Sequence, residues 1–122
     1  MRFLKLIVVA MAAATTLPAF GEDYPSRPIR IIVSTSAGGI TDLAARIVGK
    51  LITEKTGQTV IIDNRAGGGG NIAMEAVARS APDGYTFGVA NTGNIVINPF
   101  LYKHMSYNPL TELTPVGSVG TV

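Results

Sequence analysis

The chain has 122 residues, with 10 Lys and Arg against 8 Asp and Glu, and it contains no cysteine. This length is enough for one small domain with a single core. The lack of cysteine excludes disulfides, thiol catalysis and cysteine-bound metals for this chain. Two of the basic residues lie in the first 21, which hold no acid, so residues 22–122 carry 8 of each sign. That balance lacks the basic excess that is typical of nucleic-acid binding, and we expect no nucleic-acid partner.

The first 21 residues have the pattern of a secretory signal peptide. A basic start precedes an apolar run at 6–14, Pro18 follows, and Ala19-Phe20-Gly21 fits the small-x-small cleavage pattern. A membrane anchor is the alternative, but the run is shorter than the roughly 20 residues that span a bilayer. We therefore predict cleavage before Glu22, a mature chain that does not insert into the membrane, and a periplasmic location, which suits an exported chain without disulfides.

The apolar pattern of the mature part predicts alternating strands and helices. In chain order they are a strand at 29–33, a helix at 41–56, a strand at 60–62, a helix at 71–81, a strand at 85–90 and a short helical piece at 95–102. This β-α-β-α-β order predicts an α/β fold with a parallel sheet and right-handed crossovers. Residues 113–122 read like a further strand that enters a turn, so the sequence looks cut short.

Capping patterns and apolar spacing predict the ends and the buried faces of the two longer helices. Thr41 and Asn71 are candidate N-caps, and Gly57 is expected to end the first helix. The residues expected to face the core are Leu43, Ala44, Ile47, Val48, Leu51 and Ile52 in the first helix, and Ile72, Ala73, Ala76, Val77 and Ser80 in the second.

Two turns are the main candidates for a binding site. If the strand order is 2-1-3, the turns 34–42 and 90–94 face each other beyond the carboxyl ends of the strands, where open α/β sheets bind ligands. They offer backbone N–H groups, hydroxyls and one carboxylate, which would suit an anionic group at a helix N-terminus. The candidate ligand-binding residues are Ser36, Ala37, Gly38, Gly39, Thr41, Asp42, Asn91, Thr92, Gly93 and Asn94.

Each of these assignments has a structural alternative. Gly38 and Gly39 would also permit a tight turn without touching a ligand. Asp42 would pair with a ligand ammonium group or cap its own helix. The glycine run 67–70 matches neither a P-loop nor a dinucleotide fingerprint, and it is either a flexible rim loop or a ligand contact.

The remaining polar residues give no catalytic or metal-binding pattern. Arg65 could reach an anion or pair with Asp63 or Glu75, and Asp63 alone is a poor metal site. His104 has no triad, paired carboxylates or HExxH motif around it and is expected at the surface. The residues expected to pack with a solvated hydroxyl are Tyr85, Tyr102 and Tyr107.

An ordered series of motifs resembles a known family. The motifs are Tyr24-Pro25-Ser26-Arg27-Pro28-Ile29-Arg30, Ala37-Gly38-Gly39 with Asp42, Asp63-Asn64-Arg65-Ala66-Gly67, Pro82-Asp83-Gly84-Tyr85-Thr86, Ile97-Asn98-Pro99 and Tyr107-Asn108-Pro109. Together they resemble the tripartite tricarboxylate transporter receptors, the Bug family of periplasmic solute-binding proteins. The resemblance covers essentially all of the mature chain.

The resemblance implies a two-lobed, type II-like receptor with a hinge. Such a receptor closes on a small organic acid without catalysis or a cofactor and delivers it to membrane transporter subunits. Residues 22–122 would then be the N-terminal part of the first lobe, because these receptors are well over twice as long. The sequence departs from the family at Ser34-Thr35-Ser36, where a proline near Val33 is usual.

Two other readings stay open at this point. One is an exported α/β enzyme that binds a phosphate or nucleotide at its glycine-rich turns. The other is a truncated product without function, whose exposed sheet edges bind only themselves.

Overall fold

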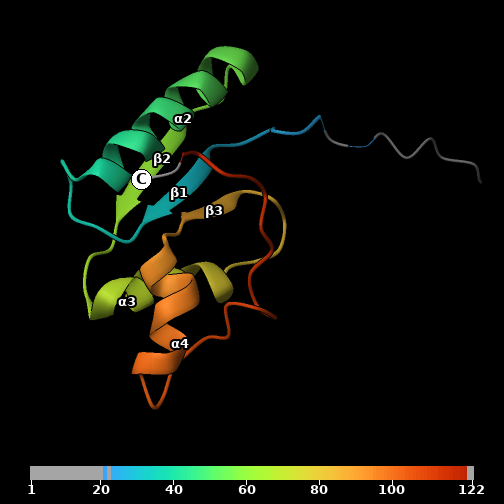
Figure 1. The fold of residues 1–122 in the computed structure, drawn as a ribbon. Helices are drawn as coiled ribbons and strands as arrows, with labels where there is room; N and C mark the ends of the chain where they lie inside the picture. Colours follow the sequence, from blue (N-terminus) through green and yellow to red (C-terminus); the bar gives the residue numbers. More distant parts are fainter. Residues whose placement is uncertain (1–20, 22, 121–122) are drawn as a thin grey trace, which may run out of the picture.

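The computed structural model describes residue 21 and residues 23–120, and the predicted signal peptide lies outside these residues. The elements, drawn in Figure 1, are β1 (Ile29–Val33), α2 (Ile40–Thr56), β2 (Val60–Asn64), η2 (Gly68–Gly70), α3 (Asn71–Ala78), β3 (Thr86–Val89), η3 (Gly93–Ile97) and α4 (Asn98–Leu101). Here η2 is a 3₁₀ turn and η3 is a π-helical turn. The predicted α/β class is confirmed.

The three strands form a parallel sheet in the order β2-β1-β3, which is the order that the sequence analysis used to locate the site. Ile31 of β1 lies beside Ile62 of β2 and Phe87 of β3. The outer strands β2 and β3 each pair only with β1 within the described residues. Two sheet edges therefore remain unpaired in this part of the chain.

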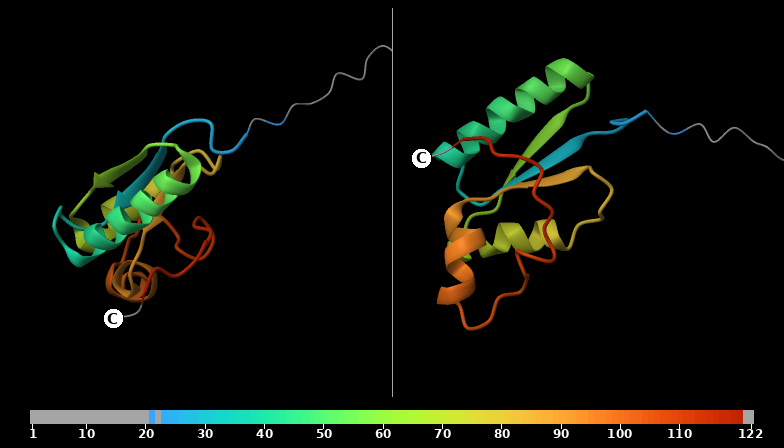
Figure 2. Two further views of the ribbon diagram at one scale, coloured as in Figure 1. Left: turned by 90° about the horizontal axis from the view of Figure 1, so that it is seen from above. Right: turned by 45° about the vertical axis from the view of Figure 1, so that its right-hand side comes forward.

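The strand β1 is buried on both faces because helices cover both sides of the sheet. Ile31 and Val33 pack toward Ala45 of α2. Ile32 points the other way, into a cluster with Ala73 and Met74 of α3. Figures 1 and 2 show this three-layer arrangement, with α2 on one side of the sheet and α3 on the other. Across residues 23–120 no helix is both long and apolar enough to cross a membrane.

Several predicted element ends are wrong by a few residues. The strand β2 continues to Asn64, because Val33 still pairs with that residue. The helix α3 ends at Ala78 rather than residue 81, and the N–H of Arg79 donates to the carbonyl of Glu75 at 2.9 Å. The strand β3 is shorter than 85–90. The final helical piece starts at 93 instead of 95 and breaks into η3 and α4. Residues 113–120 form no strand in the described chain.

The predicted inner face of α2 is partly wrong. Leu43, Ile47 and Leu51 are each more than half exposed, whereas Ala45 and Gly49 are buried. A Cβ built on Gly49 would lie 3.1 Å from Val60, so the small residues of α2 allow it to lie close to β2. Only Val48 and Ile52 of the predicted stripe join the core beside the small residues.

The predicted inner face of α3 also needs one correction. Ala73, Ala76 and Val77 pack as expected. Ile72 is half exposed, and Met74 is buried in its place.

Both predicted N-caps are wrong, and the predicted C-cap is confirmed. The N-cap residues are Gly39 for α2 and Gly70 for α3, and neither helix has a side-chain cap within the described residues. Gly57 ends α2 with φ 73°, and its N–H bonds to the carbonyl of Thr53. This left-handed conformation is the reason for a glycine there.

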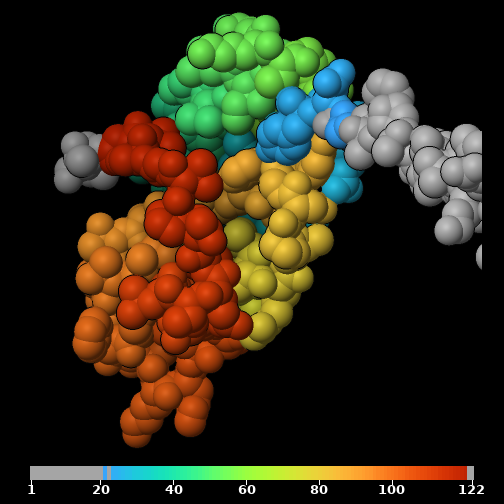
Figure 3. Space-filling view, turned by 90° about the vertical axis from the view of Figure 1, so that its right-hand side faces the viewer, coloured from blue at the N-terminus to red at the C-terminus, as the bar shows by residue number. Residues whose placement is uncertain are grey.

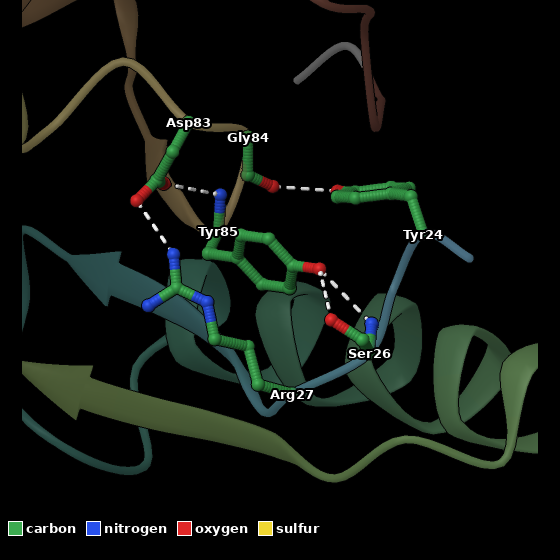
Figure 4. A network of polar contacts seen from close by, with 6 residues as sticks. All are labelled: Tyr24, Ser26, Arg27, Asp83, Gly84 and Tyr85. Carbon is green, nitrogen blue, oxygen red and sulfur yellow. Dashed lines mark hydrogen bonds and ion pairs between the residues drawn. The ribbon is translucent and has the colours of Figure 1, made fainter. Parts of the chain in front are cut away.

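The N-terminal lead-in is fastened to the turn before β3, at the amino ends of the strands. Tyr24 Oη donates to the carbonyl of Gly84 at 2.5 Å, and the N–H of Ser26 donates to Tyr85 Oη at 2.9 Å. Arg27 bonds to Asp83 at 2.7 Å and lies over the ring of Tyr85. Figure 4 shows these contacts, and Figure 3 shows the lead-in against the residues before β3.

Candidate functional site

The connections that follow the three strands all begin at one end of the sheet, because the carboxyl ends of parallel strands lie side by side. Figure 1 shows the arrowheads pointing to the same side, where α2 and α3 start. The connections are 34–39 after β1, 65–67 after β2 and 90–92 after β3. The predicted site residues of the first and third connections therefore do lie at the carboxyl ends of neighbouring strands.

The N-terminus of α2 offers backbone donors at this edge. The first N–H groups of a helix have no acceptor within the helix, and the described residues supply no side-chain cap. With the positive end of the helix dipole, these groups suit an anion. The φ of Gly38 is +87°, whereas that of Gly39 is −74°. Gly38 is thus the residue of this turn that needs glycine for its backbone conformation.

Asp42 has both carboxylate oxygens engaged inside the protein. Its Oδ2 accepts the N–H of Gly38 and the Nε–H of Arg46, each at 2.9 Å, and its Oδ1 accepts from Asn64 at 3.0 Å. The hydrogen bonds from Arg46, Gly38 and Asn64 hold the pKa of this carboxyl far below its usual range. Asp42 does not cap its own helix, and its negative charge is balanced by Arg46.

Asn64 contacts the first candidate turn, although it is not among the residues predicted for the site. Its Nδ2 donates to the carbonyl of Thr35 at 3.0 Å as well as to Asp42. This residue ends β2, so it joins the second strand to the turn after the first. The available signal was a polar Asp63-Asn64 pair directly after an apolar strand.

The turn after β3 is closed by two asparagines. The N–H of Asn91 donates to Asn94 Oδ1 at 2.9 Å, and the N–H of Asn94 donates to Asn91 Oδ1 at 3.2 Å. Asn94 is fully buried, whereas Asn91 and Thr92 are exposed. Of the four residues predicted here, Asn94 therefore shapes the turn from inside, and Asn91 and Thr92 face outward.

Three buried polar atoms of the candidate site lack a hydrogen-bond partner among the described residues. They are Ser34 Oγ, Thr35 Oγ1 and Asn94 Nδ2. A Cβ built on Gly70 would lie 2.7 Å from Asn94 Nδ2 and 3.1 Å from Ser34 Cβ. Gly70 therefore lies against both the turn after β1 and the η3 turn that follows β3, and a side chain there would clash with both neighbours.

The glycine run is a packed left-handed turn. All of Gly67–Gly70 have positive φ, Gly70 donates to the carbonyl of Gly67 at 2.9 Å, and Asn71 donates to that of Gly68. A Cβ on Gly69 would lie 2.9 Å from Tyr102 Oη. The N–H groups of Gly70 and Asn71 are thus used within the turn, and close packing accounts for two of the four glycines.

The other polar candidates have structural rather than ligand-binding roles within the described residues. Arg65 pairs with Asp63 at 3.0 Å, and Arg30 bonds to the same carboxylate. Desolvation opposes ionisation of Asp63, but the two arginines outweigh it and lower its pKa. His104 is exposed. Tyr107 is buried and its hydroxyl is hydrogen-bonded, so the prediction of a solvated hydroxyl is wrong for it. Within residues 23–120 no group of three or more acidic or histidine side chains could hold a metal.

Two hollows in the surface lie away from this edge. One of about 340 Å³ lies between α2 and β2 and is lined by Arg46, Lys50 and Val60 among others. The other, of about 740 Å³, lies beside α4 and is lined by Phe100, Tyr107 and Leu110 among others. Neither hollow is lined by a residue of the turns 34–42 or 91–94, so the candidate site lies in neither of them.

The sequence of this chain matches known proteins. Residues 44–122 match the model of the tripartite tricarboxylate transporter family receptor, TctC. The chain is 38% identical to a UPF0065 protein of Bordetella pertussis strain Tohama I, over all of this chain and 38% of that protein. It is 37% identical to the protein BugT of the same organism, over 99% of this chain and 38% of that protein. The chain thus spans little more than a third of the length of the curated relatives it matches.

Solved structures are similar to this chain in both fold and sequence. A Rhodopseudomonas palustris protein solved with adipate is 40% identical, with a TM-score of 0.71 over 73% of this chain and 30% of that one. MatC of Rhodopseudomonas palustris, solved with bound malate, is 34% identical, with a TM-score of 0.72 over 76% of this chain and 32% of that one. The resemblance seen in the sequence motifs is confirmed, and the chain belongs to the tripartite tricarboxylate transporter family of receptors.

Proposed function

We propose that this chain is the N-terminal part of the first lobe of a periplasmic receptor that captures a small carboxylate-bearing solute. One observation carries the proposal. The N-terminus of α2, which has no side-chain cap, and the turn after β3 both lie at the carboxyl ends of neighbouring strands. The turns 34–42 and 91–94 contain no Lys or Arg. A carboxylate would therefore be held by backbone N–H groups, hydroxyls and amides rather than by a paired cation.

The family supports this choice of ligand. Two relatives of known structure bind adipate and malate, both small dicarboxylates. Their chains are well over twice as long as this one, since 73% and 76% of this chain match only 30% and 32% of them. In the complete receptor a second lobe would supply the facing half of the site, and closure would exclude water from the ligand.

The location and the partners follow from the same proposal. The first 21 residues would direct export and be removed, which leaves the receptor free in the periplasm. The partners would be the membrane subunits of a tripartite tricarboxylate-type transporter. The family is a solute-binding one, and this chain would bind its ligand without transforming it or using a cofactor.

The rival function is an exported enzyme that binds a phosphate or nucleotide. The glycine run would be its phosphate loop, but the N–H groups of Gly70 and Asn71 are used inside the turn. His104, the one histidine of the sequence, is exposed and lies in neither candidate turn. Both observations favour the receptor.

Calorimetry with the full chain separates the two functions. One half-lobe offers a few charge-assisted hydrogen bonds of roughly 1.5–3 kcal/mol each, less the cost of association. We expect malate and adipate to bind with a Kd of about 1 mM or weaker, and ATP and inorganic phosphate not to compete. Tight ATP binding would instead establish the enzyme reading, and micromolar binding of malate by a monomer would show that one lobe is sufficient.

A further inference from the structure

Tyr107 lies outside every helix and strand of the described chain, yet only 4% of it is exposed. Its Oη donates to the carbonyl of Asn94 at 2.7 Å, with Asn71 Oδ1 as a second acceptor at 3.2 Å. Asn94 closes the turn after β3, and Asn71 begins α3 directly after the glycine run. One hydroxyl thus contacts both the turn 91–94 and the first residue of α3.

A second side chain extends this contact into the glycine run. Asn98 Nδ2 donates to Asn71 Oδ1 at 2.7 Å and to the carbonyl of Gly69 at 3.0 Å. The start of α3 is therefore joined to α4 by Asn98 and to the turn after β3 by Tyr107. The three residues form a continuous chain of neutral hydrogen bonds.

The ring and the hydroxyl of Tyr107 have separable roles. The ring packs with Ile32, Ala73 and Met74 in one of the two core clusters. The hydroxyl reaches past that cluster to the backbone of the turn. Burial raises the pKa of Tyr107, so the phenol keeps its proton at neutral pH and stays a donor. Removal of the hydroxyl alone would leave the core contacts in place.

We propose that Tyr107 is a positioning residue of the candidate site, whose hydroxyl fixes the turn 91–94 relative to the start of α3. The expected effect on ligand binding rests on the proposed function. In that function the exposed Asn91 and Thr92 face the ligand only if the turn is held in place. Without the hydroxyl the buried Asn94 carbonyl loses a hydrogen bond, and the loss of a buried hydrogen bond is costly. The turn then moves or opens to recover a hydrogen bond with water.

Amide hydrogen exchange in the full chain tests the coupling with Tyr107→Phe. The matched control is Tyr24→Phe, which removes a hydroxyl that donates to the carbonyl of Gly84 at the opposite end of the sheet. We expect Tyr107→Phe to speed exchange of residues 91–97 and 69–72 by roughly tenfold, the effect of one buried hydrogen bond. The amides of α2 should keep their wild-type rates, and Tyr24→Phe should leave both segments unchanged.

A second variant, Asn71→Ala, and a second readout, the ¹⁵N shift of Ile95, supplement the exchange rates of Tyr107→Phe. Asn71→Ala should speed exchange of 69–72 and leave the turn 91–94 protected, because the Tyr107–Asn94 bond remains. The ¹⁵N shift of Ile95 reports on the carbonyl of Asn94, with which it shares a peptide group, and it should move in Tyr107→Phe but not in Asn71→Ala. Unchanged exchange in both segments, or an equal rise throughout α2 and α3, would overturn the positioning role.

The effect of the Tyr107 hydroxyl on ligand binding is measured separately. Malate titrated to tens of millimolar should bind Tyr107→Phe several-fold more weakly than it binds wild type or Tyr24→Phe. If wild type binds neither malate nor adipate, the proposed function fails, while the exchange rates still decide whether Tyr107 holds the turn. If Tyr107→Phe binds malate as wild type does, the hydroxyl does not position the site.

Discussion

The Asn64 side chain donates one hydrogen bond to Asp42 Oδ1 at 3.0 Å and a second to the carbonyl of Thr35. Asp42 in turn accepts the N–H of Gly38. The end of β2 thereby fixes the turn after β1 at both of its ends. This relationship makes Asp42 and Asn64 supports of the first candidate turn.

Replacing Asn64 tests that support. Asn64→Ala removes both hydrogen bonds, and we expect the free energy of unfolding to fall by about 1–3 kcal/mol, the cost of leaving buried acceptors unpaired. Urea unfolding followed by circular dichroism measures the change. Lys55→Ala, at an exposed position of α2, is the control and should stay within about 0.5 kcal/mol of wild type. Equal effects of the two substitutions would show that Asn64 does not hold the turn.

Acid should destabilise the protein through three carboxylates. Hydrogen bonds from Arg46 to Asp42 and from the Tyr85 backbone to Asp83 lower their pKa values, and the arginines around Asp63 lower its pKa against desolvation. A carboxyl with a lowered folded-state pKa stabilises the fold above its unfolded pKa of about 4. This stabilisation is lost as the pH falls further, because the unfolded state then binds protons first.

Urea midpoints measured from pH 7 to about pH 2.5 therefore should fall steadily below about pH 4.5. The variant Asp42→Asn, which has no carboxyl at this position, should lose less stability over the same range while being less stable than wild type at pH 7. A wild-type midpoint that does not change between pH 5 and pH 3 would contradict the stated pKa directions.

The glycines of the candidate site should differ in their tolerance of a methyl group. Gly38 has φ +87° with open space around its Cβ position, so Gly38→Ala should cost about 1 kcal/mol from backbone strain alone. Gly70→Ala adds a clash with Asn94 Nδ2 at 2.7 Å and should cost more. Gly117→Ala, with open space and no positive φ, is the control. Thermal unfolding gives the order, and a Gly70 variant as stable as the control would refute the close packing at Gly70.

The arrangement of the strands was predictable from the sequence because it depends on repeated local signals. β1 is almost continuously apolar, as a strand covered on both faces must be. Gly57 marks the end of α2 through a conformation that few other residues adopt. The parallel pairing, and with it the common carboxyl end of the strands that carries the turns, follows from the β-α-β-α-β pattern. The order β2-β1-β3 is one of several that this pattern permits, and the structure selects it.

The errors have physical causes that the pattern alone does not contain. The apolar stripe of α2 suggested that Leu43 and Leu51 are buried, but Gly49 allows the helix to approach β2 closely, and its small-residue face turns inward. Thr41 and Asn71 have the chemistry of caps, yet Asn71 is used by Tyr107 and Asn98 instead. Contacts between different segments of the chain, such as Gly49 with Val60 and Asn71 with Tyr107, decide these cases, and local periodicity does not report them.

The signal-peptide assignment predicts the first residue of the exported protein. Intact-mass measurement of the protein recovered from the periplasm should give a chain that begins at Glu22, because Ala19-Phe20-Gly21 supplies the small residues of a cleavage site. Replacing Ala19 and Gly21 by bulky residues should block this cleavage. A periplasmic protein that retains all of the first 21 residues would contradict the signal assignment.

The central claim is that carboxylates bind at the carboxyl-end turns, and an NMR shift map of the ¹⁵N-labelled chain tests it most directly. Malate or adipate added at millimolar concentration should shift the amides of residues 36–42 and 91–94, with a Kd of about 1 mM or weaker. The lead-in at 24–27, fastened at the opposite end of the sheet, should not respond. Shifts confined to residues outside the two turns, or none at saturating ligand, would contradict the account.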